Sequence, residues 1–158
     1  MASTGRPMVM IKLLLDTNIL LGALIADRKA HISCLSILLQ NNIALVTNEY
    51  VLKEARKIME EVYSFDQEDV NRFIEFLRAK MEIVKTPSKE EIKKINSNDK
   101  SDRPIISSAQ KHRCVLITDD MPTRKDAGKY VLALGSTEAI DLFNIRLAKE
   151  PLKYGKRS

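Results

Sequence analysis

Short runs of consecutive apolar residues alternate along this chain with longer segments in which apolar residues recur at helical spacing. The runs are Lys12–Asp16, Ile43–Val46, Met81–Val84, Cys114–Thr118 and Val131–Leu134. Continuous apolar runs of this length are typical of strands that are buried on both faces. Because helical segments separate most consecutive runs, we expect a mainly parallel sheet. The sequence therefore predicts an α/β fold, a single three-layer domain whose central sheet is flanked by helices.

The segments between the runs carry helix-start signals and apolar stripes. We expect helices over Asn18–Ala26 and Ala30–Gln40, and further helices that begin near Thr47 or Asn48, Asp66, Ser88, Asp102 and Ser136. The helix after Asn48 has one apolar stripe, formed by Val51, Ala55, Ile58, Met59 and Val62. Ser88-Lys-Glu-Glu91 has the spacing of a capping box, and Pro104 is tolerated in the first turn after Asp102.

The composition suits one domain in a reducing compartment. The chain has 158 residues, of which 44% are hydrophobic and 30% charged, enough to bury one core. We expect the domain over residues 10–150, a flexible N-terminal tail or leader over residues 1–9, and a basic C-terminal tail over residues 151–158. No apolar run reaches the about 18 residues that a membrane span needs. The two cysteines do not make a disulfide scaffold, so we expect a cytoplasmic protein without membrane contact.

Acidic residues stand where two of the predicted strands end. Asp16 ends the first strand, and Asp119 and Asp120 follow Cys114–Thr118. In open parallel sheets, ligands bind outside the carboxyl ends of the strands. We therefore expect Asp16 and Asp120 at one edge of the sheet. Two further acids can reach this edge from their predicted helices, Glu54 and Asp102.

Each acid has a local explanation when it is taken alone. Asp16 and Asp102 can cap helices, and Glu54 can pair with the neighbouring Arg56 or Lys57. Together, however, carboxylates a few Å apart repel one another unless a cation neutralises them. Oxygen ligands suit Mg²⁺ or Mn²⁺, and such an ion can promote hydrolysis of a phosphodiester. The excess of 26 basic over 21 acidic residues, a net charge of +5, would then attract a polyanionic substrate.

At these acids the chain resembles the PIN-domain ribonucleases, which include VapC-type toxins. The matching pieces are Leu13–Leu20 (LLLDTNIL), Thr47–Glu54 (TNEYVLKE), Asp99–Ala109 (DKSDRPIISSA) and Val115–Asp120 (VLITDD). The resemblance implies cleavage of RNA that depends on Mg²⁺ or Mn²⁺. It also implies that the metal-binding and catalytic acids are Asp16, Glu54, Asp102 and Asp120, and that the residues orienting the carboxylates or water are Thr17, Asn18 and Thr118.

The sequence leaves three choices open within this set. Asp119 can share or replace the role of Asp120, and Asp99 can be the ligand instead of Asp102 or beside it. Glu49 competes with Glu54, which is preferred because its spacing after the strand fits the family better. Glu49 falls in the first helical turn, where the helix dipole favours an acid in any case.

Other chemistries fit the chain less well. A Cys₂His₂ zinc site could use His31, Cys34, His112 and Cys114, but their spacing is not that of a zinc finger. A phosphatase of the haloacid dehalogenase class needs a second acid two residues after the first, where this chain has Asn18. A PIN-like module that binds RNA or a protein without cutting is a further alternative.

Partner sites are suggested by charge and by amphipathic helices. Two basic clusters, Lys111–Arg113 and Arg124–Lys129, could guide RNA, and Lys53, Arg56 and Lys57 flank Glu54. The helices near Ala30–Leu39 and Val51–Val62 could form a homodimer interface or a groove for an antitoxin, although both are expected to pack in the core.

Overall fold

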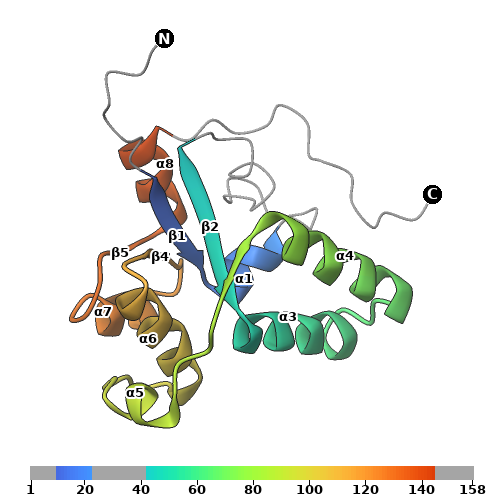
Figure 1. The fold of residues 1–158 in the computed structure, drawn as a ribbon, viewed down its shortest axis with the longest axis horizontal. Coiled ribbons are helices and arrows are strands. Elements are labelled where there is room, and N and C mark those ends of the chain that lie inside the picture. Colours follow the sequence, from blue (N-terminus) through green and yellow to red (C-terminus); the bar gives the residue numbers. More distant parts are fainter. Residues whose placement is uncertain (1–9, 23–41, 145–158) are drawn as a thin grey trace.

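The computed structural model describes residues 10–22 and 42–144 of the chain and shows one parallel sheet between helices (Figure 1). The strands are β1 (Ile11–Leu15), β2 (Ile43–Asn48), β3 (Glu82–Val84), β4 (Val115–Ile117) and β5 (Ala133–Leu134). All neighbouring pairs are parallel, and the order across the sheet is β3-β2-β1-β4-β5. The predicted α/β class with a mainly parallel sheet is confirmed.

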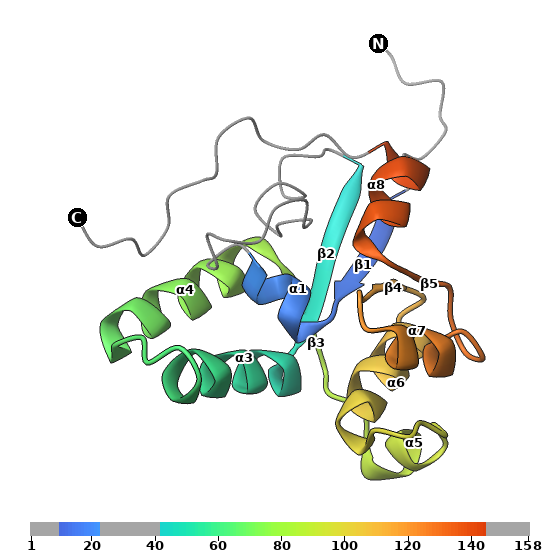
Figure 2. The same cartoon turned by 180° about the vertical axis from the view of Figure 1, so that it is seen from behind.

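Several helices begin at caps that the sequence indicates. The helices are α1 (Thr17–Leu21), α3 (Glu49–Glu61), α4 (Gln67–Lys80), α5 (Lys89–Lys93), α6 (Arg103–Lys111), α7 (Met121–Ala127) and α8 (Ser136–Phe143), with a short 3₁₀ helix, η2 (Lys100–Asp102). Asn48 and Asp66 cap α3 and α4 through their side chains, and Ser88 forms the predicted capping box with Glu91. In both views α3 and α4 lie to one side of the strands, and α5, α6 and α7 lie to the other (Figures 1 and 2).

The register puts the carboxyl end of β1 at the centre of the sheet. Leu13 of β1 pairs with Leu45 of β2 on one side and with Val115 of β4 on the other. Leu13, Leu14 and Leu15 are at most 1% exposed, because helices cover both faces of the sheet. The chain reverses its direction of travel across the sheet between β1 and β4, which makes this edge the topological switch point where ligands bind in such folds.

Two details differ from the sequence prediction. Met121–Ala127 forms α7, although the sequence patterns indicated only a basic cluster there. Val62 is 66% exposed and follows the end of α3, so the apolar stripe of that helix ends at Met59. The predicted helix over Ala30–Gln40 and both tails lie outside the described residues. No helix in the described part of the chain is long and apolar enough to cross a membrane.

Candidate active site

Asp16 follows β1 directly and is held by β4. Its backbone N–H donates to the carbonyl of Ile117 at 2.9 Å, which extends the β1–β4 pairing by one residue. This pairing brings Thr118 alongside, and the Thr118 hydroxyl donates to Asp16 Oδ2 at 2.6 Å. Asp16 Oδ1 accepts the backbone N–H of Asn18 at 3.3 Å, the capping contact expected from the sequence. Asp16 therefore caps α1 with one carboxylate oxygen and accepts the Thr118 hydroxyl with the other.

Glu54 reaches the same edge from α3. Its Oε1 accepts the hydroxyl of Thr17, the residue after Asp16. Glu49, its competitor, is instead held by Arg78 of α4 through both carboxylate oxygens, the longer contact being 2.8 Å. Of the two glutamates, the structure therefore places Glu54 beside the end of β1.

Asp102 and Asp120 meet at one hydroxyl. The Oγ1 atom of Thr123 lies 2.8 Å from Asp102 Oδ2 and 2.5 Å from Asp120 Oδ2. Asp120 also caps α7, since the same Oδ2 accepts the Thr123 backbone N–H at 3.0 Å. Asp102 occupies the cap position of α6 but makes no capping bond with its side chain. The expectation that Asp102 caps this helix is therefore wrong for its carboxylate, which turns toward Thr123.

Asp99 is exposed and lies at the margin of this group. Its Oδ1 accepts the backbone N–H and the hydroxyl of Ser101, at 2.9 and 2.7 Å, and these bonds lower its pKa. Its charge nevertheless contributes to raising the pKa of Glu54 and of Asp102. Tyr50 of α3 donates its hydroxyl to the carbonyl of Ser101 at 3.1 Å and so ties the helix of Glu54 to η2.

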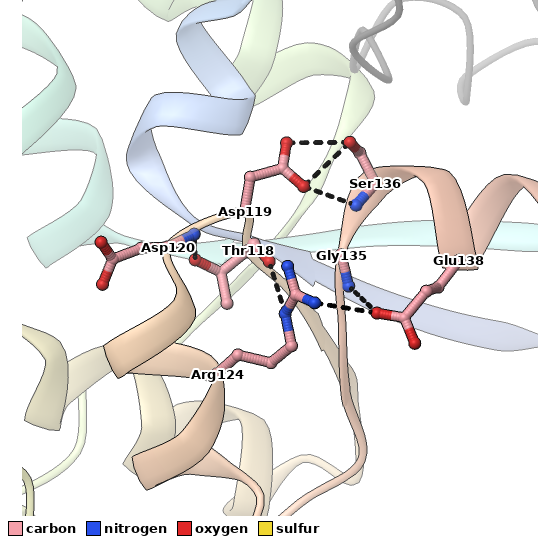
Figure 3. A network of polar contacts seen from close by, with 7 residues as sticks. All are labelled: Thr118, Asp119, Asp120, Arg124, Gly135, Ser136 and Glu138. Atoms are coloured by element: carbon pink, nitrogen blue, oxygen red, sulfur yellow. Dashed lines mark hydrogen bonds and ion pairs between the residues drawn. The ribbon is translucent and has the colours of Figure 1, made fainter.

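The side chains of the adjacent Asp119 and Asp120 point in different directions, and that of Asp119 points toward Ser136 (Figure 3). Asp119 accepts the backbone N–H of Ser136 at 2.8 Å and contacts its hydroxyl, which places its carboxylate at the start of α8. Arg124 secures the same turn by donating to the carbonyl of Thr118 at 3.3 Å and to Glu138 at 3.0 Å. The guanidinium lies so close to Gly135 that a Cβ there would be 2.6 Å from it, so a larger residue at this position would displace the Arg124 side chain.

The acids disfavour ionisation in one another. Burial is the largest cause that raises the pKa of Asp16 and of Glu54, and it outweighs the opposing hydrogen bonds from Thr118 and Thr17. The charge of Asp120 adds to the rise at Asp16. For Asp102, burial and the charges of Asp99, Asp16 and Asp120 raise the pKa to about 6. These shifts show that the carboxylates act on one another electrostatically.

No basic side chain of the described residues forms an ion pair with Asp16, Glu54, Asp102 or Asp120. Within the same ranges, Glu54 Oε2, Asp102 Oδ1 and Asp120 Oδ1 have no hydrogen bond. No three acidic, histidine or cysteine side chains of the described residues converge closely enough to enclose an ion by themselves. Mg²⁺, however, keeps several waters and is commonly bound by only one or two carboxylates. The oxygen-only donor set therefore fits a hydrated Mg²⁺ or Mn²⁺ ion.

The basic clusters lie differently from what the sequence indicated. Lys111–Arg113 precedes β4 and is therefore at the end of that strand opposite to Asp120, where Lys111 pairs with Glu91 at 3.1 Å. Arg124 is held by Glu138, as described above. Lys57 is exposed, and its charge lowers the pKa of Glu54. Of the four residues considered for a zinc site and disfavoured by their spacing, Cys114 is buried as a free thiol, while His31 and Cys34 lie outside the described residues.

Sequence reasoning missed three residues of this region: Thr123, Tyr50 and Asp126. Asp126 is 7% exposed and accepts the Ser97 hydroxyl at 3.2 Å and the Asn98 N–H at 3.0 Å. One sequence signal could have placed Thr123 in a helix. Asp120-Met-Pro122 has the same Asp-x-Pro pattern that begins α6, and it predicts a helix start just before Thr123.

A family comparison agrees with this geometry. The sequence pattern of the PIN domain matches residues 12–121, which is more than half of the chain. The chain therefore belongs to the PIN domain family, whose members are typically nucleases. Membership in the PIN domain family argues against the alternative that the protein is a phosphatase of the haloacid dehalogenase class.

Solved structures with the same fold include two VapBC proteins. VapBC2 from Rickettsia felis, bound to a DNA fragment from their promoter, has a TM-score of 0.60 at 16% identity over 79% of this chain and 98% of that chain. VapBC-1 from nontypeable Haemophilus influenzae has a TM-score of 0.57 at 21% identity over 80% and 99%. PAE2754 from Pyrobaculum aerophilum has a TM-score of 0.57 at 16% identity over 87% and 99%. No curated protein matches the chain by sequence.

Proposed function

We propose that the protein is an endoribonuclease that depends on Mg²⁺ or Mn²⁺ and hydrolyses RNA phosphodiester bonds at the acidic edge of its sheet. The observation that supports this proposal is the electrostatic coupling among Asp16, Glu54, Asp102 and Asp120 near the switch point, without a basic ion-pair partner among the described residues. Partly desolvated carboxylates that raise one another's pKa are destabilising unless a cation neutralises them. Membership in the PIN domain family supports a nuclease.

Each residue has a defined part in this proposal. The free oxygens of Glu54, Asp102 and Asp120, together with Asp16, would hold the ion, some of them through its bound waters. The ion would supply a Lewis acid for the phosphate and lower the pKa of an attacking water. Thr118 and Thr17 keep Asp16 and Glu54 in place through their hydroxyls, and the Asn18 N–H fixes the other oxygen of Asp16. Exposed Lys57, near Glu54, would attract the RNA backbone.

A cleavage assay with a matched pair of glutamate variants tests the proposal. Purified protein is incubated with single-stranded and structured RNA in Mn²⁺, in Mg²⁺ and in chelator. We expect cleavage only with the metals, and a loss of about a hundredfold or more in Asp16→Asn and Glu54→Gln. Glu49→Gln changes a glutamate of the same helix that pairs with Arg78, and should cleave like the wild type.

Two results would contradict the proposal. Cleavage that persists in chelator would exclude the metal, and undiminished cleavage by Asp16→Asn would exclude the acidic edge. RNA binding without turnover, unchanged in Asp16→Asn, would instead favour a binding module.

The VapBC likeness also supports a role as a toxin with an antitoxin-type protein partner. On this proposal, induced expression in a bacterial host arrests growth, whereas expression of Asp16→Asn does not. Growth that is unaffected by an enzyme active in vitro would favour an RNA-processing role instead.

A further inference from the structure

The hydroxyl of Thr123 is shared between two of the acids. Its Oγ1 atom lies 2.8 Å from Asp102 Oδ2 and 2.5 Å from Asp120 Oδ2, so the single hydroxyl proton is shared between the two oxygens. Thr123 is only 6% exposed, and its side chain is therefore not free to turn away into solvent. The contact with Asp120 joins neighbouring residues in one helical turn, but the contact with Asp102 joins α7 to η2.

The helix that carries Thr123 is itself fixed on both sides. Asp126, one turn further along α7, accepts hydrogen bonds from Ser97 and Asn98 in the loop that leads to η2. Arg124 bonds the carbonyl of Thr118 at the end of β4. Because α7 holds both the loop before Asp102 and the turn that carries Asp120, the separation of these two acids depends on this helix.

A fixed spacing of Asp102 and Asp120 would favour the binding of an ion by their free oxygens. Each of Asp102 and Asp120 uses Oδ2 for Thr123, and Oδ1 is left without a hydrogen bond among the described residues. Side chains that lose rotamer freedom in the folded protein no longer lose it when an ion binds. Groups that orient ligands in this way commonly change metal affinity by about 10- to 100-fold when they are removed.

We propose that Thr123 is a positioning residue which sets the spacing between Asp102 and Asp120 for a divalent cation. This inference rests on the proposed function, because it assigns a role toward the same ion. It adds to that function a contact from α7 that links Asp102 to Asp120.

Calorimetric titration of the RNA-free protein with Mn²⁺ tests the inference without relying on activity. We expect Thr123→Val to weaken Mn²⁺ binding at least tenfold and Thr123→Ser, which keeps the hydroxyl, to stay within about threefold of the wild type. Thr47→Val is the matched control, since the buried Thr47 hydroxyl has no hydrogen-bond partner. It should bind Mn²⁺ like the wild type. If Thr123→Val does not fold, Thr123→Ala takes its place.

Equal Mn²⁺ affinity in Thr123→Val and the wild type would overturn the inference. A loss that Thr123→Ser does not restore would also overturn it, because the methyl group and not the hydroxyl would then matter.

A metal-independent measurement separates this inference from the proposed function. Unfolding free energies are compared in chelator for the wild type, Thr123→Val, Asp102→Asn and the double variant. Non-additive changes are expected if the Thr123 hydroxyl contacts Asp102, and additive changes would overturn the inference. A wild type that binds no Mn²⁺ would overturn the proposed function, while the comparison in chelator would still decide whether the contact exists.

Discussion

Three buried threonines, Thr17, Thr118 and Thr123, each place a hydroxyl against a carboxylate at the acidic edge. A hydrogen bond to a carboxylate favours its ionised form, whereas burial disfavours it. Burial is the larger effect at Asp16 and Glu54, because the pKa of both is raised in spite of the threonines. The hydroxyls therefore orient the acids without cancelling the cost of their charge, and that cost is what a cation would relieve.

Asp102 makes the metal-free protein sensitive to pH. Its pKa of about 6, raised from 3.8, means that the folded protein holds this proton more tightly than the unfolded chain does. The stabilisation is complete below pH 3.8 and is lost as the pH rises through about 6. We expect Asp102→Asn in chelator to be more stable than the wild type at pH 8, by roughly 1 kcal/mol after allowance for solvent screening.

Urea unfolding at pH 4 and pH 8 measures this difference. At pH 4 the advantage of the asparagine should shrink, because the wild-type carboxyl is largely protonated there. An Asp102→Asn protein that is less stable than the wild type at pH 8 would contradict the expectation.

Thr47, unlike the three threonines at the acidic edge, has a hydroxyl whose removal should stabilise the protein. It is 1% exposed, and its hydroxyl is buried without a hydrogen-bond partner in the described structure. Thr47→Val removes the desolvation cost of this group at nearly constant volume, so we expect a gain of about 1 kcal/mol in unfolding free energy. Thr118→Val removes a hydroxyl that bonds Asp16 and should lower stability under the same conditions. A loss in both variants would contradict the assignment for Thr47.

At the scale of elements, α6 and α7 begin with the same Asp-x-Pro pattern, yet only α6 was predicted from the sequence. The difference lies in how the two helices are packed. Helix α6 buries Pro104, Ile105, Ile106 and Ala109, which give an apolar stripe with helical period. Helix α7 buries Thr123, Asp126 and Ala127, so hydrogen bonds hold much of its inner face. Its sequence has no apolar period for pattern analysis to detect.

Asn48 connects α3 to α6, and its replacement should lower the unfolding free energy substantially. It is fully buried, caps α3 by accepting the Val51 N–H at 2.9 Å, and donates to the Ser108 hydroxyl of α6 at 2.6 Å. We expect Asn48→Ala to lower the unfolding free energy by about 2–3 kcal/mol, because a cap and a buried hydrogen bond are both lost. Asp66→Ala, which removes an exposed cap of α4, should cost only about 1 kcal/mol. Equal losses in the two variants, measured by chemical unfolding, would contradict this account.

At the scale of the whole molecule, the sheet could be predicted because its strands are continuous apolar runs that only two-sided burial explains. The strand order could not be derived from those runs, since pairing depends on contacts between distant segments. Asp16 and Asp120 could be placed at one edge because each directly follows a strand. The sequence could not show that Glu49 is bonded by Arg78 or that Asp119 is bonded by Ser136, because each contact joins residues from different elements.

Metal should stabilise the whole fold in a manner that depends on pH. An ion that binds only the folded protein raises its melting temperature, and protons compete for the same oxygens. Because the pKa of Asp102 is about 6, we expect Mn²⁺ to raise the melting temperature more at pH 8 than at pH 5. Scanning fluorimetry with and without chelator measures this, and Asp16→Asn should show a much smaller rise. An equal rise at both pH values would contradict the competition.

The central position of β1 has a consequence for the order in which the chain is made. Asp16 leaves the ribosome before its partner strand β4 and Asp120, which follow only after β2, β3 and the helices between them have been synthesised. The growing chain can pair β1 with β2 while the other edge of β1 is still open. Asp16 and Asp120 can approach one another only when β4 pairs with that edge. A nascent chain therefore cannot bring Asp16 and Asp120 to the same edge until β4 and Asp120 have been translated.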